Sequence, residues 1–189
     1  MEARMLPIMH VEKFKIPAEV GEELLKAAST AVQTVARACG EEHANKGGFF
    51  RFLLVPYEGC KFFELEPLVE GWAGGTSNQS NIAQYYHLSM EKAHRLGRNT
   101  LCLSSFESER DPEKCQFGGA IRTPCWVDGI NDDAANYYIS SFSGLPEEGD
   151  EAAMLLTMKL MEWMPPYYPI TEMIIDRSNN QLARELLAS

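Results

Sequence analysis

The sequence predicts one α+β domain, in which helices flank a mostly antiparallel sheet of about five strands. Three features predict it: segments with helical spacing of apolar residues, pairs of short strand-like segments between them, and glycine or proline turns at the junctions. A length of 189 residues suits a single domain with a sizeable core. The hydrophobic content of 45% is ordinary for a globular protein.

Helices are expected over residues 17–39, 81–96, 146–164 and 181–187. The first begins at Pro17 and ends before Gly40, and the second ends before Gly97. The third opens with a cluster of acids and is broken by a proline pair. Because its apolar residues lie nearly all round, we expect it to be covered on several sides, most economically by a second subunit. Asn179 or Asn180 is expected to cap the last helix.

Strands are expected over residues 49–55, 60–65, 99–106, 120–127 and 136–142. The first two form a hairpin around Pro56-Tyr57-Glu58-Gly59. Residues 71–80 and 107–116 are expected to be loops, and 167–176 a mixed extended segment. We divide the chain into a domain over 1–164 and a C-terminal arm over 165–189, which lies on a neighbour or across its own surface.

Charge and cysteine content narrow the classes of partner. The chain carries 27 acids against 17 bases, a net charge of -10, which repels nucleic acids and anionic membranes. Its five cysteines include no Cys-x-x-Cys pair, which argues against a disulfide framework or a structural zinc site. We see no signal peptide and no apolar run near the roughly 18 residues of a membrane span. A cytoplasmic protein without nucleic-acid or membrane partners is therefore expected.

Four segments, in this order and spacing, resemble the GlcG/HbpS-like family, which also occurs at the C-terminus of PduO-type proteins. They are Val55-Pro56-Tyr57-Glu58-Gly59-Cys60, Met90 to Gly97, Phe117-Gly118-Gly119-Ala120-Ile121, and Ser143-Gly144 with Asp150-Glu151-Ala152. The resemblance covers about residues 44–163, with Pro56 where the family often has an acid and Ala120-Ile121-Arg122 where its proline would sit. It implies an α+β domain, an association with haem or corrinoids, and ring or stacked oligomers in some members.

The sharpest candidate site lies on the second expected helix. His87, Glu91 and His94 stand at i, i+4 and i+7, so their side chains project from one helix face. They could ligate a divalent metal or haem iron, or form a solvated face on which Glu91 pairs with a protonated histidine; the solvated face is the commoner case. A basic cluster at the end of this helix could hold a carboxylate, a phosphate or haem propionates, or offset the negative helix end. The cluster comprises Lys92, His94, Arg95 and Arg98.

Two further features could contribute to a ligand pocket. Gly118-Gly119 could let backbone N–H groups approach a ligand, with Arg122 reaching the same cavity, or simply kink the start of a strand. Asp150 could act as a general base, although an acid in the first turn of a helix is stabilising without any catalytic role.

The leading hypothesis is a cytosolic, homo-oligomeric small-ligand-binding protein, with haem or another tetrapyrrole as the candidate ligand. The alternative is an oligomeric scaffold or adaptor that binds other proteins through its acidic surface and tail, without catalysis. A third hypothesis is an enzyme that degrades haem or isomerises an organic acid, for which the sequence offers no acid/base pair. Catalytic and metal-binding residues stay unassigned.

Overall fold

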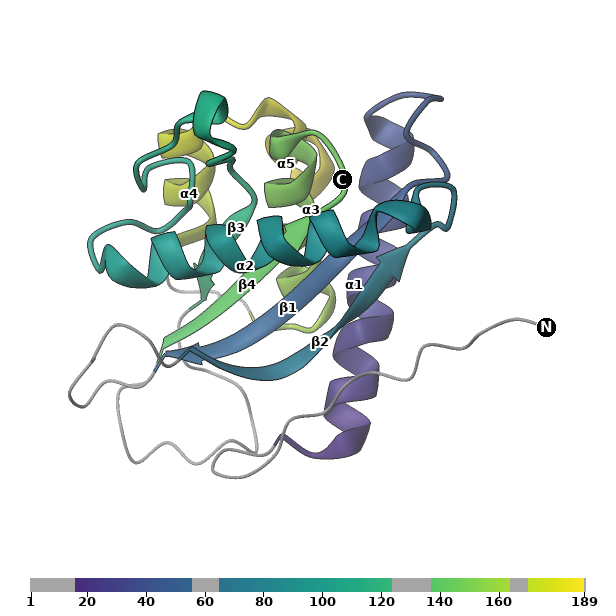
Figure 1. Cartoon of the computed structure of the whole chain (residues 1–189), viewed down its shortest axis with the longest axis horizontal. Helices are drawn as coiled ribbons and strands as arrows, with labels where there is room; N and C mark the ends of the chain where they lie inside the picture. Colours follow the sequence, from purple (N-terminus) through teal and green to yellow (C-terminus); the bar gives the residue numbers. More distant parts are fainter. Residues whose placement is uncertain (1–15, 56–64, 124–136, 164–169, 189) are drawn as a thin grey trace.

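The computed structural model of the chain describes residues 16–55, 65–123, 137–163 and 170–188. Within these ranges, helices cover both faces of one four-stranded antiparallel sheet with the strand order β2-β1-β4-β3 (Figure 1). The strands are β1 (Gly47–Val55), β2 (Glu66–Gly74), β3 (Ala120–Thr123) and β4 (Tyr137–Ser143). The helices are α1 (Ala18–Ala38), α2 (Ile82–Arg98), α3 (Glu147–Leu160), α4 (Ile170–Ser178) and α5 (Gln181–Ala188), with 3-10 turns η1 (Gln79–Asn81) and η2 (Pro112–Lys114).

Alternation along the strands separates two cores. On β1, Phe50, Phe52 and Leu54 face the main core, which α1 and α3 cover from one side. Leu53 and Val55 face the opposite side, where α2 packs across the sheet. Figure 1 shows α2 in front of the sheet and α1 behind it. The central strand β1 is buried along its whole length because both faces are covered.

The α+β class is confirmed, but the described part of the sheet has four strands rather than about five. Residues 99–106 do not form the expected strand; only an isolated bridge joins Ser104 to Ile121 of β3. Backbone turns interrupt pairing here, because the N–H of Cys102 bonds to the carbonyl of Asn99 and that of Glu107 to the carbonyl of Ser104.

Other expected boundaries also shift. The strand that pairs with β1 on its outer side is β2, Glu66–Gly74, which takes in part of the expected 71–80 loop. The expected hairpin turn and most of the expected strand at 60–65 lie outside the described ranges, as does the second half of the strand expected at 120–127. The segment expected to be extended at 167–176 contributes most of α4. Asn180 caps α5, since its Oδ1 accepts a hydrogen bond of 2.9 Å from the N–H of Ala183.

The third helix is covered by its own chain. Residues 149–158 of α3 are all buried, and α1, β4 and α5 pack around them. The apolar side chains around α3 are therefore buried without a second subunit. Ile174, Ile175 and Ala183 of the last two helices belong to the main core, so α4 and α5 pack against the rest of this chain. No helix in the described ranges is both long and apolar enough to cross a membrane.

Candidate functional site

A cavity of about 540 Å³ opens at the C-terminal end of α2. Its described lining comes from the last two turns of α2, the residue after them, and the loop that returns towards β3. The lining residues are Glu91, His94, Arg95, Arg98, Asn99, Ser108, Glu109 and Gln116. All eight are polar or charged. The size falls within the range of small-molecule sites, and the chemistry suits a polar ligand rather than an apolar one.

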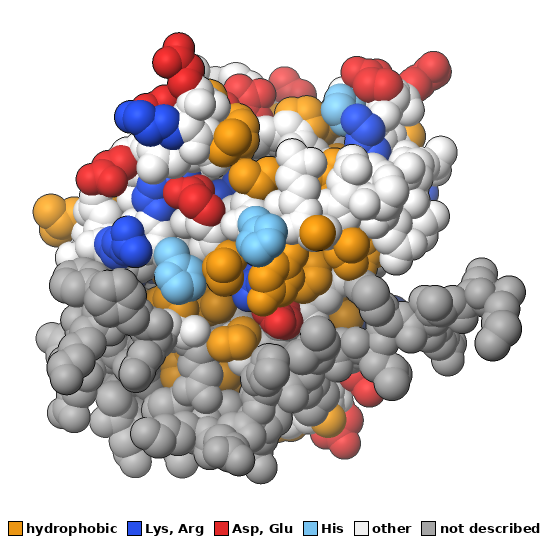
Figure 2. Space-filling view, in the orientation of Figure 1, with side chains coloured by type: hydrophobic (Ala, Val, Ile, Leu, Met, Phe, Trp, Pro, Cys, Tyr) orange, Lys and Arg blue, Asp and Glu red, His pale blue; other side chains and the backbone are white. Residues whose placement is uncertain are grey.

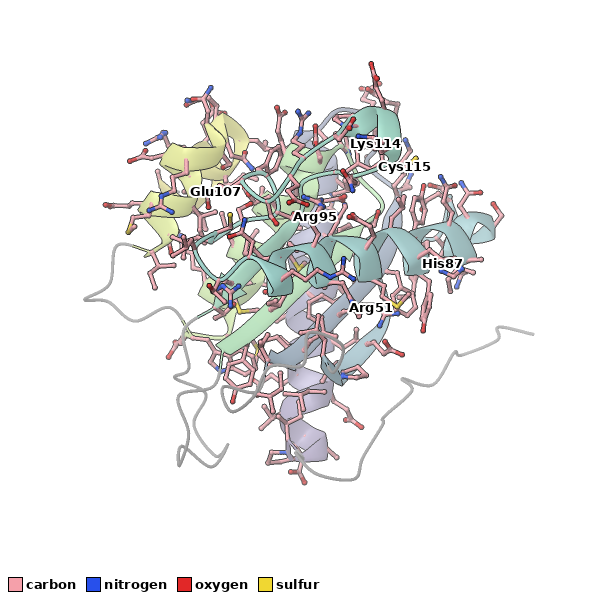
Figure 3. All side chains as sticks on the ribbon, turned by 60° about the vertical axis from the view of Figure 1, so that its left-hand side comes forward. Arg51, His87, Arg95, Glu107, Lys114 and Cys115 are labelled. Atoms are coloured by element: carbon pink, nitrogen blue, oxygen red, sulfur yellow. The ribbon has the colours of Figure 1, made fainter. Side chains whose placement is uncertain are left out.

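Arg95 holds in place the loop that lines the cavity opposite α2. Its side chain is 6% exposed, and its guanidinium donates hydrogen bonds to the carbonyls of Ser105 (2.6 Å), Ser108 and Phe117 (2.5 Å). Its Nε donates to Glu91 Oε1 over 2.7 Å. Figure 3 shows Arg95 between α2 and the loop that carries Lys114 and Cys115. Because the protein uses these donors, Arg95 positions the loop and is not free to hold a ligand.

His94 lies half-buried in the lining. Burial lowers the pKa of its imidazole below the ordinary value of 6.5, and the nearby Arg98 and Arg51 guanidinium groups lower it further, against the opposing charge of Glu91. The ring is therefore neutral at pH 7, with one nitrogen that donates a hydrogen bond and one that accepts.

We expect the ring signals of His94 to titrate below pH 6.5 in NMR spectra recorded against pH. The unfolded chain takes up this proton near pH 6.5 whereas the native state resists it, so the stabilising contribution is lost as pH falls below about 6.5. A His94→Gln variant assigns the signals and should show a shallower loss of unfolding free energy between pH 7 and pH 5. A His94 titration above pH 6.5 would contradict the described burial.

Two charged side chains of the lining have no hydrogen bond or ion pair to another described residue. Arg98 is exposed in the last turn of α2, and Glu109 is exposed at the rim. Glu109 has φ +52°, a left-handed backbone conformation that is uncommon for residues other than glycine. The amides of Asn99 and Gln116 add donors and acceptors around these charges.

Only part of the sequence-predicted helix face reaches the cavity. Glu91, His94 and Arg95 line it, but His87 does not; its exposed ring packs edge-on against Tyr86, with ring centres 5.6 Å apart. Figure 3 shows His87 towards the opposite end of α2 from Arg95, and Figure 2 shows histidine and apolar side chains together on this face. Among the described residues, no group of three or more His, Cys, Asp or Glu side chains could hold a metal ion. The geometry therefore gives the three-ligand interpretation no support.

The two adjacent glycines serve packing rather than the cavity. A Cβ on Gly118 would come within 2.2 Å of the Phe106 ring. Gly119 has φ +113°, and a Cβ there would lie 2.5 Å from Asp150 Cβ and 3.0 Å from Lys92 Nζ. Glycine is thus required where the backbone passes a buried ion pair. The described lining of this cavity includes neither glycine.

Arg122 is likewise structural. Its side chain is 5% exposed and donates hydrogen bonds to the carbonyls of Leu96 (2.9 Å), Asn99 (3.2 Å) and Cys102 (3.2 Å). These bonds tie the end of α2 and the following turn to β3. Arg122 therefore supports the cavity from behind, and the described lining does not include it.

Two buried ion pairs anchor the α2 side of the sheet. Lys92 Nζ lies 2.6 Å from Asp150 Oδ2 and donates to the Phe142 carbonyl over 3.0 Å. Burial raises the pKa of Asp150 to about 6, against the opposing charge of Lys92. At 2% exposure Asp150 links α3 to α2 and is placed for structure rather than general-base chemistry.

The second pair joins β1 to β2 beneath α2. Arg51 Nη1 lies 2.6 Å from Glu70 Oε2, and Nε donates to Ser89 Oγ of α2 over 3.2 Å. The guanidinium carbon lies 4.2 Å from the centre of the Tyr86 ring, a cation–π contact. Figure 3 shows Arg51 on the sheet side of α2.

The loop side of the cavity was not predicted from the sequence. Ser108, Glu109 and Gln116 belong to a segment expected to be only a charged surface loop. No local pattern marks them, because their place depends on the bonds from Arg95.

A scan against protein-family models finds no match to the chain, and neither the curated proteins nor the solved structures show a significant similarity to it.

Proposed function

We propose that the protein binds a small polar ligand in the cavity at the C-terminal end of α2. One observation carries the proposal. Arg98 and Glu109 line a cavity of small-molecule size without a hydrogen bond or ion pair to another described residue, whereas Arg95, Arg122 and Lys92 are committed to the fold. Charged groups left available in an otherwise organised polar cavity are the usual means of orienting a ligand.

The lining of the cavity and the packing of the tail also bear on the other hypotheses. Membership of the GlcG/HbpS-like family is part of the proposal, supported by the quoted motifs and by an antiparallel sheet flanked by helices. Haem is a weaker candidate than a small polar molecule, because the described lining offers no apolar side chain to the macrocycle. The scaffold alternative gains no support from the tail, since α4 and α5 contribute to the main core. Self-association stays a prediction, to be tested by analytical ultracentrifugation.

The test is a thermal-shift screen of the whole chain against free amino acids, small dicarboxylates, sugar phosphates and, separately, hemin. A ligand at ten times its Kd should stabilise the protein by about 1.4 kcal/mol, which raises Tm by roughly 3–6 °C. In an Arg98→Ala variant we expect this response to be lost, because one charge-assisted hydrogen bond contributes about 1.5–3 kcal/mol.

Arg37→Ala is the matched control. Arg37 is exposed in the last turn of α1 as Arg98 is in α2, so both variants lose one charge and one favourable interaction with a helix end. A response retained in Arg37→Ala but lost in Arg98→Ala supports the proposal. Equal responses in the two variants would contradict it, as would hemin being the only compound that stabilises the protein.

A further inference from the structure

We infer that the ligand is zwitterionic: a free amino acid or a close analogue, whose carboxylate meets Arg98 and His94 and whose ammonium group meets Glu109. This inference rests on the proposed function and specifies the chemistry of the same site.

The balance of charge in the lining is the first reason. Two arginines and two glutamates line the cavity. Arg95 and Glu91 pair with each other over 2.7 Å, which leaves Arg98 and Glu109 as the charges available to a ligand. A ligand with only a negative charge would meet Glu109 without compensation, and one with only a positive charge would meet Arg98. A zwitterion satisfies both, so the site discriminates by opposing charges.

The surrounding field is the second reason. The chain carries a net charge of -10, which disfavours the approach of an anion but acts little on a molecule without net charge. The neutral imidazole of His94 can donate a hydrogen bond to a carboxylate. The amides of Asn99 and Gln116 suit a polar side chain on the ligand, and the described lining includes no apolar side chain to pack against a hydrophobic one.

The way Glu109 is held is the third reason. The preceding residue, Ser108, is clamped to Arg95 from both sides: its carbonyl accepts from Arg95 Nη1, and its Oγ donates to the Arg95 carbonyl over 2.9 Å. Glu109 itself keeps a left-handed backbone, with φ +52°. Its carboxylate is thus presented from a fixed backbone at the rim, which reduces the ordering that binding would otherwise require.

The experiment is calorimetry of the whole chain with the twenty standard L-amino acids, tested singly. The tightest binder is then compared with its deaminated analogue, which keeps only the carboxylate, and its decarboxylated analogue, which keeps only the ammonium group. We expect both analogues to bind at least tenfold more weakly than the amino acid. Arg98→Ala should weaken the amino acid and the deaminated analogue alike. Glu109→Gln should weaken the amino acid at least tenfold, whereas the deaminated analogue should bind as tightly as before or more tightly, because its carboxylate no longer meets the Glu109 charge.

The outcomes separate this inference from the proposed function. If the deaminated analogue binds as tightly as the amino acid, or if Glu109→Gln has no effect, the site is an anion site and the inference is wrong while the proposed function stands. The same holds if no amino acid binds but another compound of the screen gives a response that depends on Arg98. If no compound gives such a response, both are overturned.

Discussion

Lys92→Met should lower the free energy of unfolding by about 3–5 kcal/mol, because it leaves the carboxylate of Asp150 buried without its cation. The carboxylate then keeps only hydrogen bonds from neutral backbone groups, among them the N–H of Leu145 at 2.8 Å from Oδ1 and the backbone of Gly144. Chemical denaturation at pH 7 measures the change. The loss should be smaller at pH 5, because the pKa of Asp150 is already about 6 with Lys92 present, and removal of the cation raises it further. A protonated carboxyl is cheaper to bury than an ionised one.

The double variant Lys92→Met/Asp150→Leu distinguishes charge burial from lost packing. Replacing both partners with apolar groups of similar size removes the uncompensated charge, so it should recover much of the lost stability. A single variant that loses less than about 1 kcal/mol, or a double variant that is less stable than the sum of its single changes, would contradict the assigned role of the pair.

Arg95→Met should cost about 3 kcal/mol and also abolish ligand binding. The substitution leaves the carbonyls of Ser105, Ser108 and Phe117 without their donor, and each unsatisfied buried group costs about 1–3 kcal/mol, part of which the loop recovers by turning towards water. Since these bonds hold the loop wall, the cavity should lose its shape. Denaturation and the thermal-shift screen measure the two effects.

Arg98→Met makes the same chemical change three residues further along α2, at an exposed site. We expect its stability to stay within about 0.5 kcal/mol of the parent protein, with ligand binding weakened. If Arg95→Met keeps both its stability and its ligand response, Arg95 does not organise the cavity. If Arg98→Met is as unstable as Arg95→Met, Arg98 has a structural role that the described contacts do not show.

Local signals were enough to place most of the fold. The expected first and second helices, 17–39 and 81–96, match α1 and α2 within two residues at each end, because end signals and apolar spacing act locally. The strand that forms a hairpin with β1 was expected at 60–65 rather than at Glu66–Gly74, because Gly71 and Gly74 suggest a loop. In the fold they allow α1 to approach β2: a Cβ on Gly74 would lie 2.4 Å from Val32 Cγ1. That need for close approach depends on tertiary packing and cannot be seen in the strand itself.

Only part of the site could be predicted from the sequence, because tertiary packing decides the rest. Helical spacing correctly put Glu91 and His94 on one face, and the end of the helix drew attention to Arg98. Spacing could not show that His87 lies away from the cavity, or that Arg95 turns inward to bind carbonyls of a loop 10 to 22 residues further along the chain. The contribution of Glu109 follows from that long-range contact.

The most direct measurement is a two-dimensional ¹H–¹⁵N NMR titration of the whole chain with the compound that raises Tm most in the screen. We expect the largest shift changes to cluster at residues 91–99 and 108–116, with Arg98→Ala removing them at the same concentration. Changes centred elsewhere, for example at the Arg51–Glu70 pair beneath α2, or no saturable change at all, would contradict a ligand site at the end of α2.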